Sequence, residues 1–251
     1  MQQSERVISN PNLPEHNVTT VAVGARYKET IGALNRIGIK TIEIPDNDNL
    51  NSCLSGHADL NLFHFPKNKL FFDFDNIAGD LKDNFQLIRI KGESRKEYPA
   101  DCLINCLTVG KHLICNPDVT DRQILIDAEK TGLTVIPVNQ GYAKCSVCPL
   151  TDNALITDDL SIFRSAEKFS IDVLLISKGS IILEGMNYGF IGGATGKTGK
   201  NKLAVNGRLD SHPDCNKIID FLYKYNITPV ELINDVITDI GSIIPLLEES
   251  R

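Results

Sequence analysis

The sequence has few of the features that mark membrane or exported proteins. Its 251 residues include no tryptophan, two methionines and only 6% aromatic residues. The longest apolar runs, such as residues 173–176, are far shorter than the roughly 20 residues that a membrane-spanning helix needs. Residues 1–17, MQQSERVISNPNLPEHN, are polar and contain no apolar signal core. We therefore expect a short N-terminal arm, then a single domain over residues 18–251, in a cytoplasmic protein.

An excess of positive charge is also missing. Lysine and arginine number 26 against 32 acidic residues, which gives a formal net charge of -6. This balance argues against nucleic acid and anionic membranes as partners. The seven cysteines do not show the spacing of a small disulfide-stapled domain, so we expect thiols in a reducing compartment. The sequence does not indicate an oligomeric state.

What the sequence does contain is a repeat. Five short apolar segments, partly β-branched, each follow a glycine, asparagine or serine and are typical of β-strands. They are IKTIEI from Ile39, FQLIRI from Phe85, LTVIPV from Leu133, IDVLLI from Ile171 and ITPVEL from Ile227. The preceding residues suit a left-handed helix end, with the serine at position 170 the least suited.

Before each of these segments, apolar residues recur at the spacing of an α-helix. Apolar residues three and four positions apart predict an amphipathic helix, because such residues lie on one helix face. The stripes are Tyr27, Ile31 and Leu34; Ile77 and Leu81; Ile124, Leu125 and Ala128; Ile162, Ala166 and Phe169; and Ile218, Leu222 and Tyr225.

Tight turns supply the third part of the repeat. KNK at Lys67, VGK at Val109 and TDN at Thr151 each precede an apolar strand, at a spacing of 42 residues. A fourth turn, GKN at Gly199, comes later, and we attribute the delay to a longer loop in GGATGKTG. The segment VTTVAVG at Val18 could supply the closing strand of a fifth copy that ends the chain.

These parts predict an α/β propeller of five ββαβ-type modules, arranged with five-fold pseudosymmetry around a polar central channel. A doubly wound sheet of unrelated βα units would also alternate strands and helices. Hairpin turns at a fixed spacing argue against that alternative, because a parallel sheet does not need hairpins.

The 42-residue spacing aligns residues between modules. It places Asp59, Asp101, Ala143 and Gly185 in register, and two residues later Asn61, Leu103, Cys145 and Asn187. If these segments are extended strands, alternate side chains share a face. Odd-numbered residues then form a polar face toward the channel, and even-numbered residues form an apolar face under the helices.

The same alternation separates Cys145 from Cys148. Residues three apart on a strand point to opposite faces, so Cys145 faces the channel and Cys148 is a small core residue. Cys102 and Cys106 would also lie in the core. A structural zinc site would need a second ligand pair, and a redox CxxC would need a strand-to-helix setting. We therefore expect neither a metal nor a cofactor.

Other residues receive background roles. GGATGKT lacks one glycine of a Walker phosphate loop, because Ile191 stands at that position. Residues 192–200 are interpreted as a long hairpin loop and a candidate lid over the channel. His64 is expected to turn away from the channel, and His112 and His212 to lie at the surface.

Five such modules around a polar channel resemble the pentein, or guanidino-group-modifying, superfamily. It includes arginine deiminase, dimethylarginine dimethylaminohydrolase and the amidinotransferases. The resemblance covers roughly residues 18–247, and QGYAKCS and YGFIGGATG are similar to segments of a bacterial family placed in that superfamily. A ribosome anti-association factor of similar five-fold form is not an enzyme, so the architecture alone does not imply catalysis.

The resemblance implies roles for individual residues. The enzymes use a channel cysteine as nucleophile, a histidine in an H-x-D strand as acid/base, and carboxylates that hold the guanidinium. HAD at His57 matches H-x-D, and KCSVCP from Lys144 resembles the H-C-x-x-C-P around the nucleophile. This assigns the catalytic roles to Cys145 and His57, which lie two modules apart, as in those enzymes.

The chemistry needs a thiolate, an acid/base and a cradle for a cation. Lys144 could add positive potential near Cys145, although its side chain is expected on the opposite face. Attack on a guanidinium carbon would give a covalent thiouronium-like intermediate. Because a buried unpaired charge is costly, carboxylates must hold this small cationic substrate. The residues expected to bind it are Asp59, Asp101, Asp239, Asn61 and Asn187.

The sequence also departs from the family pattern. The glycine-rich approach to the nucleophile is missing, EGMN from Glu184 keeps only part of an EGGD motif, and Gly241-Ser242 occupies the usual nucleophile position of the last module. Two hypotheses follow. One is a cysteine-dependent hydrolase or transferase acting on a guanidino- or amidino-type C–N bond, and the other is a non-catalytic protein that binds a small ligand or a partner.

Overall fold

Each of the four predicted turns closes an antiparallel hairpin. The structure, a computed structural model, describes residues 4–75, 79–90 and 96–250. The hairpins are β4 (Leu62–Phe65) with β5 (Lys69–Phe72), β7 (Leu107–Val109) with β8 (His112–Cys115), β10 (Val147–Thr151) with β11 (Ala154–Thr157), and β13 (Thr195–Gly199) with β14 (Lys202–Val205).

A helix follows each hairpin and leads to a third strand that pairs in parallel with the second. The helices are α3 (Gly79–Asn84), α4 (Arg122–Thr131), α5 (Leu160–Glu167) and α6 (Cys215–Lys224), with a short 3-10 turn, η2 (Leu209–Ser211), before α6. The third strands are β6 (Gln86–Arg89), β9 (Thr134–Pro137), β12 (Asp172–Leu175) and β15 (Thr228–Glu231).

The fifth sheet joins the two ends of the chain. Strand β16 (Ile244–Glu249) pairs antiparallel with β2 (Val18–Gly24), and α1 (Lys28–Arg36) leads from β2 to the parallel strand β3 (Lys40–Ile44). The prediction that residues 18–24 close the last module is therefore confirmed. Residues from the expected N-terminal arm form β1 (Glu5–Val7), which pairs with the other edge of β16.

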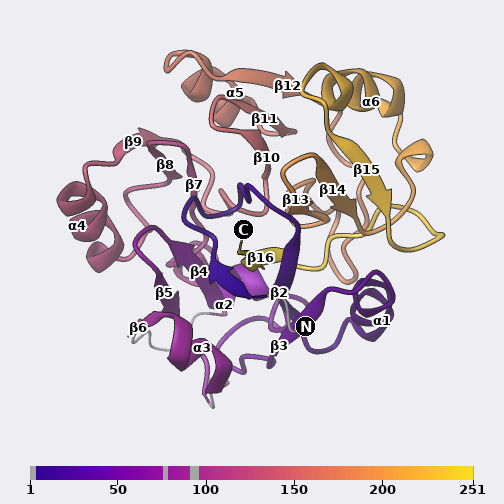
Figure 1. Cartoon of the computed structure of the whole chain (residues 1–251). Helices are drawn as coiled ribbons and strands as arrows, with labels where there is room; N and C mark the ends of the chain where they lie inside the picture. The colour runs from indigo at the N-terminus through magenta and orange to yellow at the C-terminus, as the bar shows by residue number, and fades with distance from the viewer. Residues whose placement is uncertain (1–3, 76–78, 91–95, 251) are drawn as a thin grey trace.

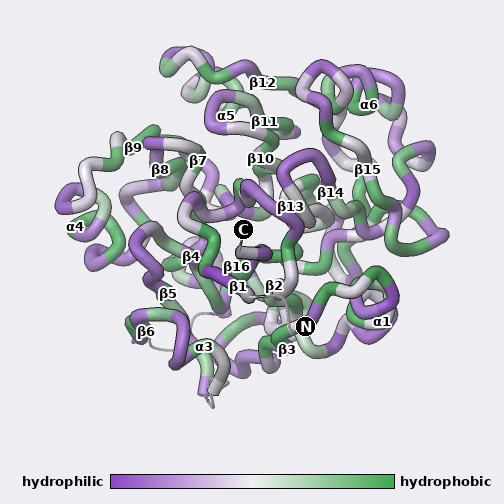
Figure 2. Tube along the Cα trace, viewed as in Figure 1, coloured by the Kyte–Doolittle hydropathy of each residue, from purple (hydrophilic) through white to green (hydrophobic). Residues whose placement is uncertain are grey.

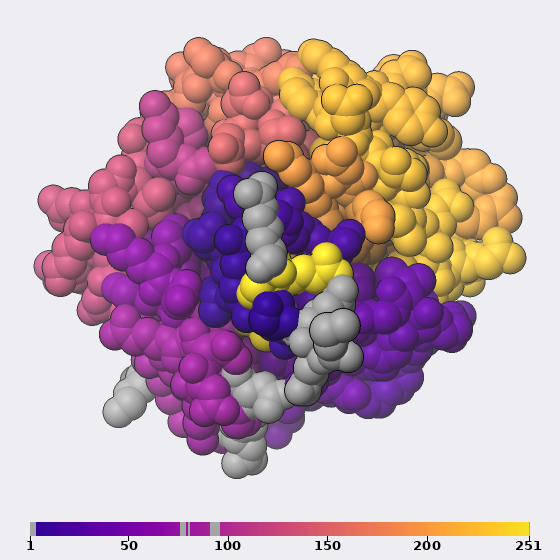
Figure 3. All heavy atoms as spheres, viewed as in Figure 1, coloured from indigo at the N-terminus to yellow at the C-terminus, as the bar shows by residue number. Residues whose placement is uncertain are grey.

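The five sheets and their helices surround a common centre, as Figure 1 shows. The predicted fold class of five repeated α/β modules is confirmed. In the space-filling view, the early residues in indigo and the C-terminal residues in yellow meet in the middle of one face (Figure 3).

The helical stripes pack between modules. Ile218 and Leu222 of α6 belong to one core with Cys148 and Ile156, which lie in the β10–β11 hairpin of the preceding module. Most of the stripe residues of α1, α4 and α5 are buried in the same way, and so is Leu81 of α3. Tyr27, Leu125 and Phe169 are partly buried, and Ile77 lies outside the described residues. Figure 2 shows the result as apolar colour along many of the strands and mixed colour along the outer helices. In the part of the chain that the structure describes, no helix is long and apolar enough to cross a membrane.

The predicted extended strands before the hairpins are wrong. Residues 58–61 form a helical turn, α2 (Ala58–Asn61), residues 100–102 form η1 (Ala100–Cys102), and residues 143–146 form a turn. Strand β5 pairs with β4 only from Leu62 onward. The backbone groups before Leu62 therefore form hydrogen bonds within the turn. For example, the backbone N–H of Leu60 donates to the carbonyl oxygen of His57 at 3.3 Å. Strand alternation does not apply to the residues nearest the centre.

The prediction that the 42-residue spacing aligns Asn187 of the fourth module with Cys145 is also wrong. Asn105, Cys145 and Gly193 each lie two residues before the first strand of their modules, β7, β10 and β13. The extra residues of the fourth module therefore precede its central turn, and Gly193 rather than Asn187 is the counterpart of Cys145. Residues 195–199, expected in a long loop and lid, are strand β13.

Two histidines expected at the surface are buried. His112 on β8 packs edge-on against Phe169, with ring centroids 5.7 Å apart. The ring of His212 accepts a hydrogen bond at Nδ1 from the backbone N–H of Asp214, at 3.0 Å. Each histidine is adjacent to a turn or a helix start, and the sequence did not reveal that its ring packs inward. His64 lies against Phe85 and Pro245 in the core.

Candidate active site

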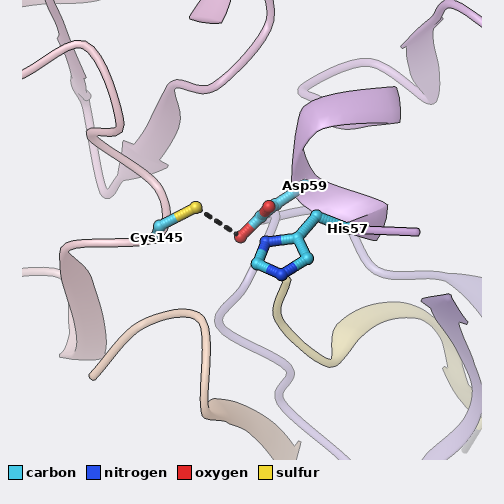
Figure 4. Close-up of side chains that lie close together, drawn as sticks. All are labelled: His57, Asp59 and Cys145. Carbon is cyan, nitrogen blue, oxygen red and sulfur yellow. Dashed lines mark hydrogen bonds between the residues drawn. The ribbon is translucent and has the colours of Figure 1, made fainter. Parts of the chain in front are cut away.

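Segments from two modules bring a thiol, an imidazole and a carboxylate together. His57 precedes α2, Asp59 lies within α2, and Cys145 lies in the turn before β10. One nitrogen, oxygen or sulfur atom from each of the three lies within 4.8 Å of the others, and all three are buried. Figure 4 shows the side chains of Asp59 and Cys145 pointing toward each other, with the His57 ring beside them.

The Cys145 thiol has two side-chain partners. It donates to Asp59 Oδ2 at 3.1 Å and accepts from Asn105 Nδ2 at 3.2 Å. The side-chain oxygen of Asn105, Oδ1, in turn accepts hydrogen bonds from the backbone N–H groups of Lys144, at 2.8 Å, and Cys145, at 3.2 Å. Asn105 therefore fixes both the backbone turn and the sulfur position.

His57 is buried without a hydrogen-bond partner for either ring nitrogen among the described residues. Its Nδ1 lies 3.9 Å from Asp239 Oδ1, too far for a hydrogen bond but close enough for electrostatic attraction. Asp239 accepts backbone hydrogen bonds from Phe190 and Gly241, each at 2.9 Å. The imidazole is therefore placed near two carboxylates with both nitrogens open.

Burial dominates the protonation of these groups. It raises the pKa of the Cys145 thiol well above its usual value, and the neighbouring Asp59 charge adds to the effect. Burial lowers the pKa of His57, although Asp59 acts in the opposite direction. The pKa of Asp239 is raised by burial to about 6. At neutral pH the resting site therefore holds a thiol and a neutral imidazole.

A cavity of about 270 Å³ opens onto these groups. His57, Cys145 and Asp239 line it together with a larger apolar and aromatic set. That set comprises Leu54, Leu60, Leu183, Met186, Tyr98, Tyr142, Tyr188 and Phe190, and the neutral polar residues Gln140 and Asn187 complete the lining. The cavity suits a small ligand with a polar or cationic end at the reactive groups and an apolar remainder.

The structure brings together some of the residues that the sequence singled out, and not others. Cys145, His57, Asp59 and Asp239 meet at the centre, and Asn187 lies exposed at the cavity lining. Asp101 accepts a hydrogen bond from Tyr142 Oη at 2.5 Å and does not line the cavity.

The Asn61 side chain forms hydrogen bonds within the protein that support the backbone around His57. Its side-chain amide donates to the carbonyls of Ser55 and His57, at 3.1 and 2.7 Å, and its oxygen accepts from Asn47 at 2.9 Å. These bonds brace the start of α2 and so hold His57 in place.

Two residues that shape the site were not identified from the sequence. Asn105 was passed over because the 42-residue spacing selected Leu103, two residues earlier. Ser242 was noted only as a departure from a family pattern, yet its hydroxyl donates to Asp59 Oδ2 at 2.5 Å. Both residues lie two positions before the start of the next strand, β7 or β16, as Cys145 does before β10. Aligning the modules by the number of residues before this strand, rather than by their turns, would have identified both.

The same three side chains could hold a metal ion. Sulfur, imidazole nitrogen and carboxylate oxygen are the ligands that zinc prefers, and three protein ligands are typical of catalytic zinc sites. From the sequence we expected no metal site, because Cys145 and Cys148 would point to opposite faces. Cys148 does pack in the core. The set His57, Asp59 and Cys145 is a different one.

Gly241 allows the last module to approach His57 closely. Its φ of +71° is left-handed, and a Cβ at this position would lie 2.3 Å from His57 Cα. We expect Gly241→Ala to lower the free energy of unfolding by about 3 kcal/mol, from strain and overlap together. Gly179 has a φ of +90°, but a Cβ there would have no atom within 4 Å, so Gly179→Ala should cost only about 1 kcal/mol. Equal losses in denaturant unfolding would contradict this account.

Comparison with solved structures confirms the fold. DDAH from Pseudomonas aeruginosa, a cysteine-to-serine mutant complexed with citrulline, matches with a TM-score of 0.56 and 11% identity over 92% of this chain and 99% of that chain. Agmatine deiminase from C. jejuni gives 0.52 and 10%, over 92% of each chain. Inosamine-phosphate amidinotransferase from Streptomyces griseus gives 0.52 and 12%, over 98% and 97%. These are members of the pentein superfamily, so the predicted resemblance is confirmed at the level of the fold.

Comparison of the sequence identifies its immediate family. None of the curated proteins matches the chain. A family model described as "Family of unknown function (DUF6873)" matches residues 22–244. The chain is therefore a member of the DUF6873 family.

Proposed function

We propose that this protein is a cysteine-dependent hydrolase or transferase that acts on a guanidino- or amidino-type C–N bond. The observation that carries the proposal is that Cys145, His57 and Asp239 line one cavity, with the Asp59 carboxylate bonded to the Cys145 sulfur. The fold shared with DDAH, agmatine deiminase and an amidinotransferase supports this reaction class.

A cationic substrate would complete the charge balance of the site. Asp59 Oδ1 is buried without a partner among the described residues, and Asp239 lines the cavity. A guanidinium in the cavity can donate N–H bonds to Asp239, and the charge of Asp59 behind the sulfur attracts it as well, which favours its binding there. Its positive charge would also stabilise the Cys145 thiolate, whose formation burial opposes.

The first half of the reaction uses His57 as a proton carrier. The neutral imidazole takes the proton of the Cys145 thiol, and the sulfur attacks the central carbon to form a C–S bond. The imidazolium then gives its proton to the leaving nitrogen as the C–N bond breaks. An amine or ammonia departs, and the remaining amidino group is a thiouronium on Cys145.

The second half returns the enzyme to its starting state. In a hydrolase, His57 takes a proton from water while the oxygen attacks the same carbon, and the C–S bond breaks to release a ureido product. In a transferase, an acceptor amine takes the place of water. The thiolate leaves and regains a proton, so both routes balance without an oxidant or reductant.

Turnover of a panel of guanidino and amidino compounds would test this function. The assay follows the release of ammonia or amine and the appearance of a ureido or transferred-amidino product. We expect at least one compound with an apolar remainder to be consumed by the wild-type protein. A thermal shift with these ligands but no consumption of any of them would instead support the non-catalytic binding protein.

Chelation provides a separate test of the chemistry. The steps above use only side chains, so prolonged treatment with a chelator should leave turnover unchanged. Turnover that is lost on chelation and restored by zinc would show that His57, Asp59 and Cys145 act as metal ligands, and would overturn the nucleophile mechanism.

A further inference from the structure

A buried lysine lies next to the proposed nucleophile and is not used in the reaction above. The Lys144 side chain is 6% exposed, and its Nζ donates to Ser242 Oγ at 2.8 Å. Ser242 is fully buried and lies two residues before β16. The lysine therefore points inward, contrary to the prediction that it leaves from the opposite face.

The serine hydroxyl connects this ammonium group to the reactive cluster. Ser242 Oγ lies 2.5 Å from Asp59 Oδ2 and 2.8 Å from the backbone carbonyl of Gly192. A hydroxyl has one proton to donate, and the lysine occupies its acceptor side. The short contact indicates that the proton is directed to Asp59.

The same carboxylate oxygen also receives the thiol. Cys145 Sγ donates to Asp59 Oδ2 at 3.1 Å. Lys144, Ser242, Asp59 and Cys145 therefore form one continuous hydrogen-bonded chain in a site from which water is largely excluded. In such surroundings a nearby positive charge stabilises a buried carboxylate.

We infer that Lys144 and Ser242 are a positioning pair that holds the Asp59 carboxylate turned toward Cys145. Neither residue lines the cavity, so neither touches the substrate. The pair acts through Asp59: the ammonium offsets the carboxylate charge, and the hydroxyl fixes which oxygen faces the sulfur. This inference rests on the proposed function for its purpose, but its effect on the thiol can be measured without any substrate.

The test is the rate at which a neutral alkylating agent, iodoacetamide, modifies Cys145, followed by peptide mass spectrometry. Removing a positive charge from the cluster makes thiolate formation harder, so Lys144→Met should be alkylated about tenfold more slowly at pH 8. Ser242→Gly should show the same trend, and glycine suits the φ of +72° at this position.

Ser146→Ala is the matched control. Ser146 is adjacent to Cys145 and buried, and its hydroxyl has no partner among the described residues, so its alkylation rate should match that of the wild type. Wild-type rates in a folded Lys144→Met or Ser242→Gly protein would overturn the inference. If no guanidino compound is consumed, the proposed function fails while the alkylation rates still decide the role of the pair.

Discussion

Replacing Cys145 with serine is expected to reduce turnover by at least about 1,000-fold, because the covalent step loses its nucleophile. Serine has nearly the same shape, but its hydroxyl is a far weaker acid than a thiol and is seldom ionised enough to attack. Asn105 and Asp59 can still bond to it, so the fold should be preserved. Steady-state kinetics on the best substrate, with circular dichroism to check folding, give the measurement.

Cys215→Ser serves as the control for the loss of a thiol. Cys215 lies at the start of α6, away from the cavity lining, so this variant should keep wild-type turnover. Activity of Cys145→Ser within tenfold of the wild type would contradict a covalent mechanism at this residue.

Replacing Asp239 with asparagine is expected to raise KM for a guanidino substrate by about 100-fold or more. Removing one partner of a buried charge pair typically costs 3–5 kcal/mol, because the other charge is left uncompensated (about 4 kcal/mol is nearly 1,000-fold). Asp101→Asn offers the comparison: that carboxylate bonds to Tyr142 rather than lining the cavity. Its KM should therefore change by less than about threefold. Similar KM changes in the two variants would contradict the assignment of Asp239 as the cation partner.

The pH dependence follows from the same carboxylate. Burial raises the pKa of Asp239 to about 6, so the group is ionised above that pH and neutral below it. A neutral carboxyl cannot balance a guanidinium charge, so kcat/KM should fall as the pH decreases through 6, by about tenfold per unit. The step near pH 6 should disappear in Asp239→Asn. A flat profile between pH 5 and 8 in the wild type would contradict this role.

The architecture could be predicted from the sequence because its signals are local. Strand segments such as 171–176 follow helix ends in the left-handed conformation, and turns such as Val109–Lys111 fix the hairpins through a few residues each. Even Ser170, the least suited helix end, adopts a φ of +61°. The repetition of these local signals, with four hairpin turns among five strand segments that each follow a helix, made the global arrangement recoverable without any long-range information.

The centre of the fold could be predicted only in part. Sequence patterns singled out Cys145 and His57, and the structure places them close together, but the alternation argument that supported them fails, since their segments are turns rather than strands. The contacts that decide the site join residues far apart in the chain, such as Ser242 to Asp59 and Asn105 to Cys145. No local periodicity encodes these pairs. They depend on how far each module extends toward the centre.

The fourth module also shows why the sequence alone could not align the central residues of the modules. A fixed spacing counts residues between turns, whereas the position of a side chain depends on where the insertion lies. Residues inserted before the central turn carried Asn187 out to the cavity lining and placed Gly193 at the centre. There, a Cβ would lie 2.0 Å from Asp239 Oδ1. Glycine at this position leaves room for the carboxylate that the proposed reaction needs.

The most direct test compares two reagents of nearly equal size on the wild-type protein: 2-chloroacetamidine, which is a cation, and neutral 2-chloroacetamide. If a thiol, an imidazole and two carboxylates form one cation-binding reactive site, the amidine should label Cys145 at least about tenfold faster than the amide. His57→Ala should slow the labelling of Cys145 by both reagents, because the imidazole that takes the thiol proton is lost. Equal rates for the two reagents, or labelling confined to other cysteines, would contradict the central claim.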